Sequence, residues 1–306
     1  MSCSSVGRFI IATQASTVST LSTMYDSSLT PKLSTSNTQD SCPITERYLS
    51  VKENILNDDK RNKGEKGEIL AKLELFHLDS LNQMGKLVDI LGTDASEGIS
   101  FLDMDTDDEI VDITNLTKKA PSSWKADCKI KMRKTGKIYC GSIKTDEKPT
   151  LLNHTPRSGK VFQERGKLHD YIDTLDKIAE EYIDKRNAGK SQDMNIDNFE
   201  CLKDHTVRER FMEALAYFVF DGTGGGDSKC KANAMITRYK NGKITFTKCD
   251  NINERRSYIV SIYNRLNISF RNKGMSKCIS DISDYCKPWI FYDNDIPKGS
   301  LHIRVK

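Results

Sequence analysis

Hydrophobic residues recur every three or four positions in three stretches of the chain, which is the spacing of an amphipathic helix. In Glu65–Leu91 they are Ile69, Leu73, Phe76, Leu81, Met84, Val88 and Leu91. In Lys167–Lys185 they are Leu168, Tyr171, Ile172, Leu175, Ile178, Ala179, Tyr182 and Ile183, and in Asp204–Phe220 they are Val207, Phe211, Leu215 and Phe218. Each stretch predicts one helix.

Alternating apolar and polar residues predict two pairs of strands. The pairs are Ala126–Met132 with Lys137–Ile143, and Ala232–Tyr239 with Lys243–Lys248. The first pair is joined by a turn that contains Thr135-Gly136. The second is joined by Asn241-Gly242, one of the strongest hairpin signals. We therefore expect two β-hairpins.

Other segments give weaker patterns. Ser300–Val305 predicts a short closing strand, and Ser257–Phe270 fits strand and helix equally well. Residues 93–123 are acidic and predict a loop with a short apolar stretch at Glu109–Ile113. The order of helices and strands indicates an α/β fold with a mixed sheet.

The first 45 residues differ from the rest of the chain. They hold eleven Ser and eight Thr and lack apolar periodicity, which predicts a disordered tail. The first 25 residues have one Arg and no acid before Asp26, which leaves a transit peptide as the alternative. We expect one ordered domain over residues 46–306.

Charge is distributed unevenly along the 306 residues, whose formal net charge is +4. Residues 74–118 have a net charge of −9, residues 119–167 have +9, and residues 229–306 have +10. The basic segments predict a strongly positive face, although a solvated lysine-rich surface would give the same pattern.

Cysteine and histidine usage excludes two classes of protein. Nine cysteines without a Cys-x-x-Cys pair, and five histidines without zinc-ligand spacing, make a disulfide framework and a structural zinc site poor explanations. Reduced thiols fit a cytoplasmic protein. The sequence contains no run of about eighteen apolar residues, which is what a membrane-spanning helix would need.

One carboxylate and one amine stand at matching places on the first predicted hairpin. Asp127 lies at the head of one strand, and Ser142, Ile143 and Lys144 end the next. Side chains alternate along a strand, so Ser142 and Lys144 share a side. Phosphodiester hydrolysis needs a cation held by oxygen ligands, an oriented water and relief of charge on the transition state, and these residue types can supply all three.

This arrangement resembles the PD-(D/E)xK nucleases, in particular type II restriction endonucleases, over residues 60–165. The resemblance implies a restriction-endonuclease-like mixed central sheet flanked by helices, and a Mg²⁺ ion. Asp127 would be the metal-binding Asp, Ser142 would stand at the second acidic position, and Lys144 would be the catalytic lysine. The Ile143 carbonyl would be a further metal ligand. Glu68, with Glu65 as second choice, would be the acid that the family's first helix supplies.

Two positions depart from the family pattern. Ala126 replaces the Pro before the metal-binding Asp. Ser142 replaces an acid, which leaves a weaker metal ligand and opens the question of whether the site cuts DNA.

The resemblance implies a sequence-specific, Mg²⁺-dependent endonuclease for double-stranded DNA, with a companion DNA methyltransferase in a bacterial or viral genome. A palindromic site would imply a homodimer, because two-fold DNA symmetry is mirrored by the protein, while a monomer stays open. The alternatives are a repair-type nuclease without sequence specificity and a DNA-binding protein without catalysis.

Seven polar or basic residues are candidates for DNA contacts, through phosphates or base edges. They are Asn153, His154 and Arg157 in a loop after the site, and Arg238, Lys240, Arg255 and Arg256 in a basic DNA-binding part at about 200–306. An ordinary loop and a solvated sheet face are the alternatives. The glycine-rich segment at 222–226 matches neither phosphate-loop pattern and predicts a helix end.

Overall fold

The computed structural model describes residues 43–121, 123–145, 149–154, 167–223, 226–271, 291–293, 296–298 and 300–306. Residues 41–306 form one compact unit. Residues 1–42 of the predicted tail and Arg157 lie outside the described residues, whereas residues 43–45, also assigned to the tail, belong to the first helix. No described helix is long and apolar enough to cross a membrane.

Three helices open the described chain: α1 (Pro43–Asn57), α2 (Lys63–Ser80) and α3 (Met84–Leu91). The prediction of one helix over Glu65–Leu91 is wrong at its middle. Asn82 has a φ of 52°, so the backbone turns there instead of continuing as a helix. Asparagine tolerates this left-handed conformation better than most residues, and the apolar spacing across the break gives no sign of it.

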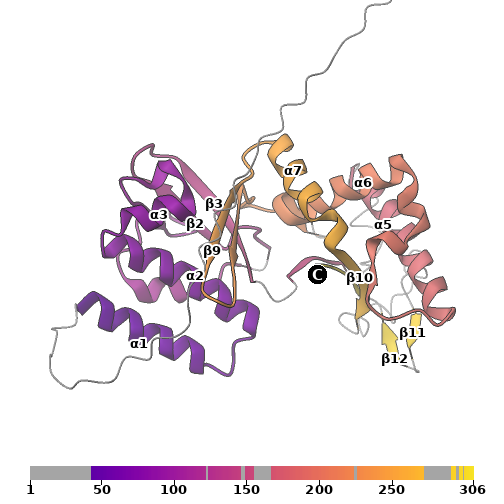
Figure 1. Ribbon diagram of the computed structural model, residues 1–306, viewed down its shortest axis with the longest axis horizontal. Helices are drawn as coiled ribbons and strands as arrows, with labels where there is room; N and C mark the ends of the chain where they lie inside the picture. Colours follow the sequence, from indigo (N-terminus) through magenta and orange to yellow (C-terminus); the bar gives the residue numbers. More distant parts are fainter. Residues whose placement is uncertain are drawn as a thin grey trace, which may run out of the picture. The chain divides into compact units, whose positions relative to one another are not determined.

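A five-stranded sheet stands against these helices (Figure 1). Its order is β1-β2-β3-β8-β9, and its strands are β1 (Ile99–Leu102), β2 (Cys128–Met132), β3 (Ile138–Thr145), β8 (Ala234–Arg238) and β9 (Ile244–Lys248). Neighbours are antiparallel except β3 and β8, which run parallel. The sheet is therefore mixed, as expected.

Both hairpins are confirmed, and their glycines explain the turns. Gly136 has a φ of 69° and Gly242 a φ of 83°, values that favour glycine. The prediction of a loop over residues 93–123 is wrong in part, because β1 pairs with β2 there. The strand is only four residues long and all four are buried, so it lacks the alternation that marks a half-exposed strand.

One face of this sheet packs against α1, α2 and α3 and forms an apolar core with them. The core unites Leu73 and Leu87 of the helices with Ile130, Tyr139 and Ile236 of the strands. Ile143 belongs to the same core. Ser142 and Lys144 have the opposite parity on β3, so their side chains leave this core.

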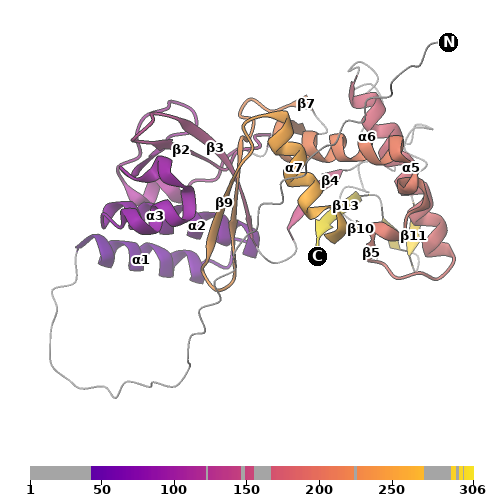
Figure 2. The same cartoon turned by 45° about the horizontal axis from the view of Figure 1, so that its top comes forward.

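A second sheet has the order β4-β13-β10-β5 (Figure 2). Its strands are β4 (Thr150–His154), β13 (Ser300–Val305), β10 (Leu266–Arg271) and β5 (Met194–Asn195). The remaining strands form two-stranded ladders: β6 (Gly222–Thr223) with β7 (Gly226–Asp227), and β11 (Phe291–Asp293) with β12 (Ile296–Lys298). The predicted strand at Ser300–Val305 is confirmed.

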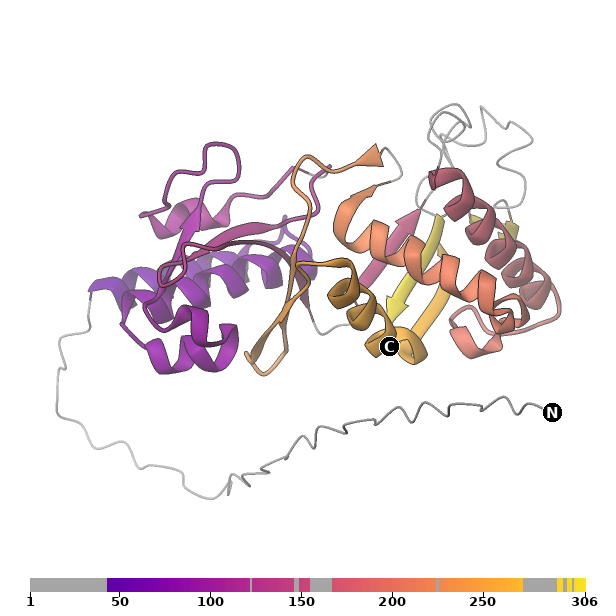
Figure 3. The ribbon, with the colours of Figure 1, turned by 90° about the horizontal axis from the view of Figure 1, so that it is seen from above.

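Helices α5 (Lys167–Asn187) and α6 (His205–Ala216) cover one face of the second sheet (Figure 3). Their apolar residues, such as Ile178, Tyr182 and Phe211, share a core with Phe270 and Ile303 of the strands. A further helix, α7 (Ile252–Ile262), is followed by β10, so Ser257–Phe270 is partly helix and partly strand. The α6 helix begins at the cap Asp204 and ends in a π-helical turn, Tyr217–Asp221.

Short 3₁₀ turns complete the described elements: η1 (Thr93–Ala95), η2 (Ile113–Thr117), η3 (Ile196–Asn198), η4 (Glu200–Lys203) and η6 (Tyr263–Arg265). The two cores meet at β8. Ala234 and Ile236 belong to the core of the five-stranded sheet, and Met235 belongs to the other. The chain therefore has a mixed α/β fold with two sheets and flanking helices.

Candidate functional site

Asp127 lies beside β3, the strand with which the predicted hairpin pairs its segment. Its main-chain N–H donates to the Gly141 carbonyl at 2.8 Å. Its Oδ2 accepts from the Ile143 N–H at 2.7 Å and from the Ser142 hydroxyl at 3.5 Å. One carboxylate oxygen is thus fixed by the neighbouring strand, and Oδ1 has no hydrogen-bond partner among the described residues.

Helix α2 contacts the last residue of β3 at a glycine. Gly67 is buried, and a Cβ built on it would lie 2.1 Å from Cγ2 of Thr145, the last residue of β3. No side chain fits at that distance, so glycine is what lets the helix touch the strand here. The next residue is Glu68, and this contact brings it to the Asp127–Lys144 end of the sheet.

Glu68 and Asp127 are electrostatically linked. Burial and, to a lesser extent, the negative charge of Asp127 together raise the pKa of Glu68 to about 7, against the opposing charges of Lys144 and Lys72. Two carboxylates that repel each other in a half-buried site share a proton or bind a cation. The charges of Asp127 and Lys144 therefore both act on Glu68, which links the three residues electrostatically.

A second amine at this site, Lys72, was not predicted. Lys72 stands one helical turn beyond Glu68 and is only 6% exposed. Its ammonium donates to the Lys118 carbonyl at 3.1 Å. Burial lowers the pKa of Lys72, and the nearby thiol of Cys128 and carboxylates of Asp127 and Glu68 oppose that shift.

A third amine, Lys125, precedes Asp127 by two residues. Burial and the positive charge of Lys144 together lower its pKa to about 8, against the opposing charge of Asp127. Its main-chain N–H donates to the Ser228 hydroxyl at 3.0 Å. The segment that leads into Asp127 is thus held by the chain just after the glycine-rich loop.

Glu65, the second choice for the helical acid, is committed elsewhere. It makes an ion pair with Lys119, and the hydrogen bond from Lys119 lowers the pKa of Glu65. It also lies in the first turn of α2, whose cap is Asn62. Glu68 is the residue that the structure places beside Asp127.

The two carboxylates of Glu68 and Asp127 are suitable ligands for a magnesium ion. Mg²⁺ is commonly held by one or two carboxylates while it keeps several waters, and Glu68 and Asp127 supply two carboxylates. Among the described residues no group of three or more His, Cys, Asp or Glu could hold a metal. The repulsion that raises the pKa of Glu68 is what a cation would relieve.

Three of the predicted DNA-contacting arginines are engaged within the protein. The Arg255 guanidinium donates to Asp221 at 2.7 Å and to the Cys249 and Ala232 carbonyls. Arg256 pairs with Glu209 at 2.6 Å, and Arg238 lies 3.6 Å from Glu74 of α2. Arg255 and Arg238 have side chains only 19% and 17% exposed, so both lie largely inside the fold.

The other DNA candidates are only partly placed. Lys240 is exposed at the end of the β8–β9 hairpin. The backbones of Asn153 and His154 belong to β4, where they pair with His302 and Leu301. The structure does not bring these residues together with the Asp127 site, and the prediction that they touch DNA stays untested.

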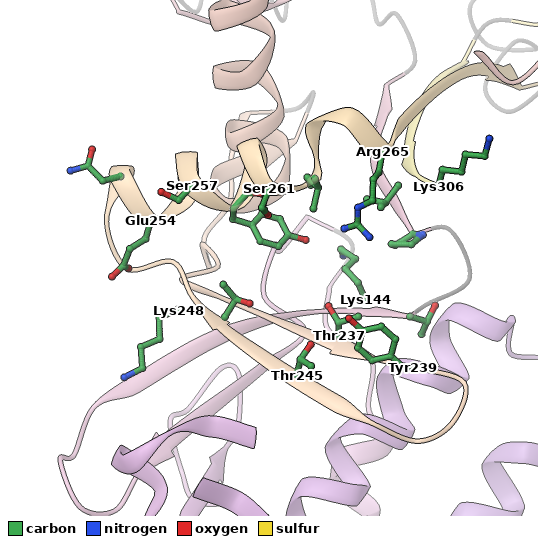
Figure 4. Close-up of a pocket in the computed structure, with 17 residues that line it drawn as sticks. Lys144, Thr237, Tyr239, Thr245, Lys248, Glu254, Ser257, Ser261, Arg265 and Lys306 are labelled. Atoms are coloured by element: carbon green, nitrogen blue, oxygen red, sulfur yellow. The ribbon is translucent and has the colours of Figure 1, made fainter. Parts of the chain in front are cut away.

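A pocket of about 530 Å³ opens on the other side of Lys144 (Figure 4). The β8–β9 hairpin forms one wall and α7 forms another. Arg265 and Lys306 stand at the end of the second sheet, across from Lys144. Lys144 therefore borders both the carboxylate pair and this pocket.

The sequence-based prediction named Asp127, Ser142, Ile143, Lys144 and Glu68 as site residues and did not include Lys72, Lys125 or the pocket. The four-residue spacing between Glu68 and Lys72 was a usable signal, because residues four apart share a helix face. Nothing local marked Lys125, whose burial depends on the Ser228 segment. In comparisons with family models, curated proteins and solved structures, the chain matches none of them.

Proposed function

We propose that the chain is a metal-dependent endonuclease that hydrolyses phosphodiester bonds in double-stranded DNA. The single observation that carries the proposal is the electrostatic linkage of Glu68 with Asp127 and Lys144, beside the Ile143 N–H that fixes the Asp127 carboxylate. Two carboxylates and a lysine that act on one another electrostatically are the minimum that this chemistry needs from a protein.

Asp127 is preorganised by its hydrogen bond from the Ile143 N–H, which leaves Oδ1 for a cation. Glu68 faces it from α2, held there by the close approach of Gly67 to Thr145. The Ile143 carbonyl and the Ser142 hydroxyl are the further oxygen ligands that the resemblance implies. The bound Mg²⁺ would supply Lewis-acid polarisation of the phosphate and activation of water.

Lys144 orients the attacking water by donating a hydrogen bond to it. Its positive charge also stabilises the charge that develops on the phosphate oxygens. Lys72 partly neutralises the two carboxylates from the helix side. The charges of Asp127 and Glu68 both raise the pKa of its buried ammonium. Water attack in line with the leaving oxygen would leave a 5′-phosphate and a 3′-hydroxyl, as in the family that the site resembles.

The architecture supports this proposal. A mixed sheet carries Asp127, Ser142 and Lys144 on two antiparallel neighbours, and a flanking helix adds the acid. A restriction-endonuclease-like core is part of the proposal and rests on the resemblance of the sequence motif. Sequence specificity, a homodimer on a palindromic site and a companion methyltransferase belong to the same proposal and rest on the resemblance.

Ser142 favours one rival enough to keep it in view. Ser142 is 1% exposed and its hydroxyl donates to Asp127 over a long 3.5 Å, but a hydroxyl is neutral and does not replace the negative charge of an acid at this position. A site with two carboxylates and several lysines could bind DNA without cutting it.

Incubation of a plasmid of known sequence with the protein and Mg²⁺ distinguishes the proposed nuclease from a DNA-binding protein without catalysis. Discrete fragments, which disappear when EDTA is added, support a sequence-specific nuclease. A metal-dependent smear supports a nuclease without sequence specificity. Uncut DNA that is retained in a gel shift supports the DNA-binding reading and contradicts the proposal.

A further inference from the structure

The pocket beside Lys144 is a built cavity with a consistent chemistry. Its volume of about 530 Å³ is in the range of pockets that hold small ligands. A duplex is far too large for it, whereas one nucleotide is of suitable size. All of its lining residues belong to the compact unit formed by residues 41–306.

Hydroxyl groups dominate the lining. They come from both walls: Thr237, Tyr239, Thr245 and Thr247 on the hairpin, and Ser257, Tyr258 and Ser261 on α7. Hydroxyls both donate and accept hydrogen bonds, so they suit the edges of a base and the oxygens of a sugar. The pocket therefore offers many hydrogen-bonding groups, unlike the two apolar cores.

Cations stand at the mouth of the pocket. Figure 4 shows Arg265 pointing toward Lys144, with Lys306 nearby. Neither Lys144 nor Arg265 makes an ion pair with any residue in the described part of the chain. Lys248 also lines the pocket, but its ammonium is bound to Asp94 at 2.8 Å and is directed away.

Glu254 is the one acid among the described residues that line the pocket. Its carboxylate accepts a hydrogen bond from the Asp250 N–H at 2.7 Å. Lys144 and Arg265 supply positive charge at the mouth, which favours a phosphate on the ligand.

Two tyrosines supply aromatic surface. Tyr258 is held by an edge-to-face contact with Phe220, with ring centroids 5.7 Å apart. Burial raises the pKa of Tyr258 to about 12, so its hydroxyl keeps its proton at neutral pH and can donate. The backbone of Tyr239 is fixed in the hairpin, because its N–H donates to the Lys243 carbonyl at 2.8 Å.

We propose that this pocket binds one nucleotide of the DNA strand, unstacked from its neighbours, next to the phosphate that Lys144 approaches. Arg265 and Lys144 hold its flanking phosphates, and Tyr239 contacts its base. Aromatic side chains stack on bases of any sequence, and cations at the mouth bind the backbone. The inference rests on the proposed nuclease, and it adds local opening of the duplex as a requirement for cutting.

The probe is thymidine 3′,5′-bisphosphate, a single nucleotide with a phosphate on each side, titrated calorimetrically into the full chain. Arg265→Ala and Tyr239→Ala are each expected to weaken binding at least tenfold, and Tyr239→Phe, which keeps the ring, less than threefold. Arg47→Ala is the matched control, because Arg47 is exposed on α1 and pairs with Asp112 outside the pocket. It is expected to leave binding unchanged.

Inorganic phosphate provides the second arm. If it binds as tightly as the nucleotide, or if Tyr239→Ala binds normally, the site recognises phosphate alone and the proposal is overturned. Thermal melting of each variant establishes that it is folded. A variant that melts early is replaced by Arg265→Gln or Tyr239→Ser.

Asp127→Asn separates this inference from the proposed function, because Asp127 does not line the pocket. If both hold, the variant loses cleavage and binds the nucleotide as well as the wild type does. A wild type that cuts DNA but does not bind the nucleotide overturns the pocket alone. A wild type that binds the nucleotide but never cuts overturns the nuclease and leaves the pocket standing.

Discussion

Glu68 on α2 and Asp127, which directly precedes β2, repel each other at one end of the strands of the five-stranded sheet. The repulsion adds to the effect of burial and brings the pKa of Glu68 to about 7. They lie 59 positions apart in the chain, and neither is needed to build a core. Such a pair is costly for the fold unless a cation or a proton neutralises it, which makes its presence informative about function.

The pH dependence of stability follows from this pair. The pKa of Glu68 is about 7 in the folded chain and about 4.5 in the unfolded one, so between these values the folded state binds more protons. The free energy of unfolding should therefore fall as the pH rises from about 4.5 to 7, by roughly 3 kcal/mol from this group. Urea unfolding of the metal-free protein at pH 5 and pH 8 measures it.

Glu68→Gln should remove that dependence. The variant should gain stability relative to the wild type at pH 8 and not at pH 5, because glutamine is neutral at both. An equal difference between variant and wild type at the two pH values would mean that Glu68 titrates normally and is not close to Asp127.

The contact between Gly67 and Thr145 should respond strongly to one methyl group. Gly67→Ala places a Cβ in a space that Thr145 already fills, so we expect a loss of about 1–3 kcal/mol in stability. It should also reduce cleavage more than its stability loss explains, because it displaces Glu68. Chemical unfolding and initial rates measure the two effects.

Gly85 is the matched control for that substitution. It also lies in a helix, α3, and a Cβ there would meet nothing within 4 Å. Gly85→Ala should be neutral or stabilising by up to about 1 kcal/mol, because alanine favours helix. If both variants behave alike, α2 does not approach β3 as closely as described.

Arg255 should prove to be a structural residue. Its guanidinium joins Asp221 to two main-chain carbonyls and lies over the Phe220 ring at 5.5 Å. Arg255→Ala leaves Asp221 and the carbonyls unpaired, so we expect a loss of about 2–4 kcal/mol in stability. Arg256→Ala, with a side chain 54% exposed, should cost less than about 1 kcal/mol.

Equilibrium unfolding in urea distinguishes these two arginines. If Arg255→Ala is as stable as the wild type and instead binds DNA more weakly, the sequence-based assignment of Arg255 to the DNA surface is right. The internal partners described above would then be incidental.

Cys140 should be the reactive thiol of the described chain. The hydrogen bond from the Cys230 thiol lowers the pKa of Cys140 to about 7, and the charge of Lys129 acts in the same direction. Iodoacetamide modifies thiolates, so its rate at Cys140 should rise with a midpoint near pH 7. Burial raises the pKa of Cys249 to about 12, and that thiol should stay unmodified.

Peptide mapping by mass spectrometry over pH 5–9 measures the modification at each cysteine. Cys230→Ala removes the hydrogen-bond donor and should move the Cys140 midpoint toward the ordinary value of about 8.5. A wild-type midpoint already at that value would show that the two thiols are not in contact.

The local parts of the fold were predictable from the sequence, and the tertiary parts were not. Alternation and a glycine turn suffice to pair β2 with β3, and this register alone puts Asp127 beside Ser142. The break at Asn82 and the buried strand β1 leave no periodic signal. Lys72 binds the Lys118 carbonyl and Arg255 binds Asp221 and Ala232, all more than twenty residues away, so basic residues that looked alike in the sequence have different environments.

The role of Lys144 as the catalytic lysine can be measured by comparing DNA cleavage by Lys144→Ala and Lys131→Ala. Lys144 acts electrostatically on the carboxylate pair, whereas Lys131 is an exposed lysine of the neighbouring strand β2. With Mg²⁺ and a defined plasmid, we expect Lys131→Ala to cut like the wild type and Lys144→Ala to lose at least a hundredfold in rate while it remains folded and bound to DNA. If the two variants cut equally well, Lys144 is not a catalytic residue and the proposed nuclease site is wrong.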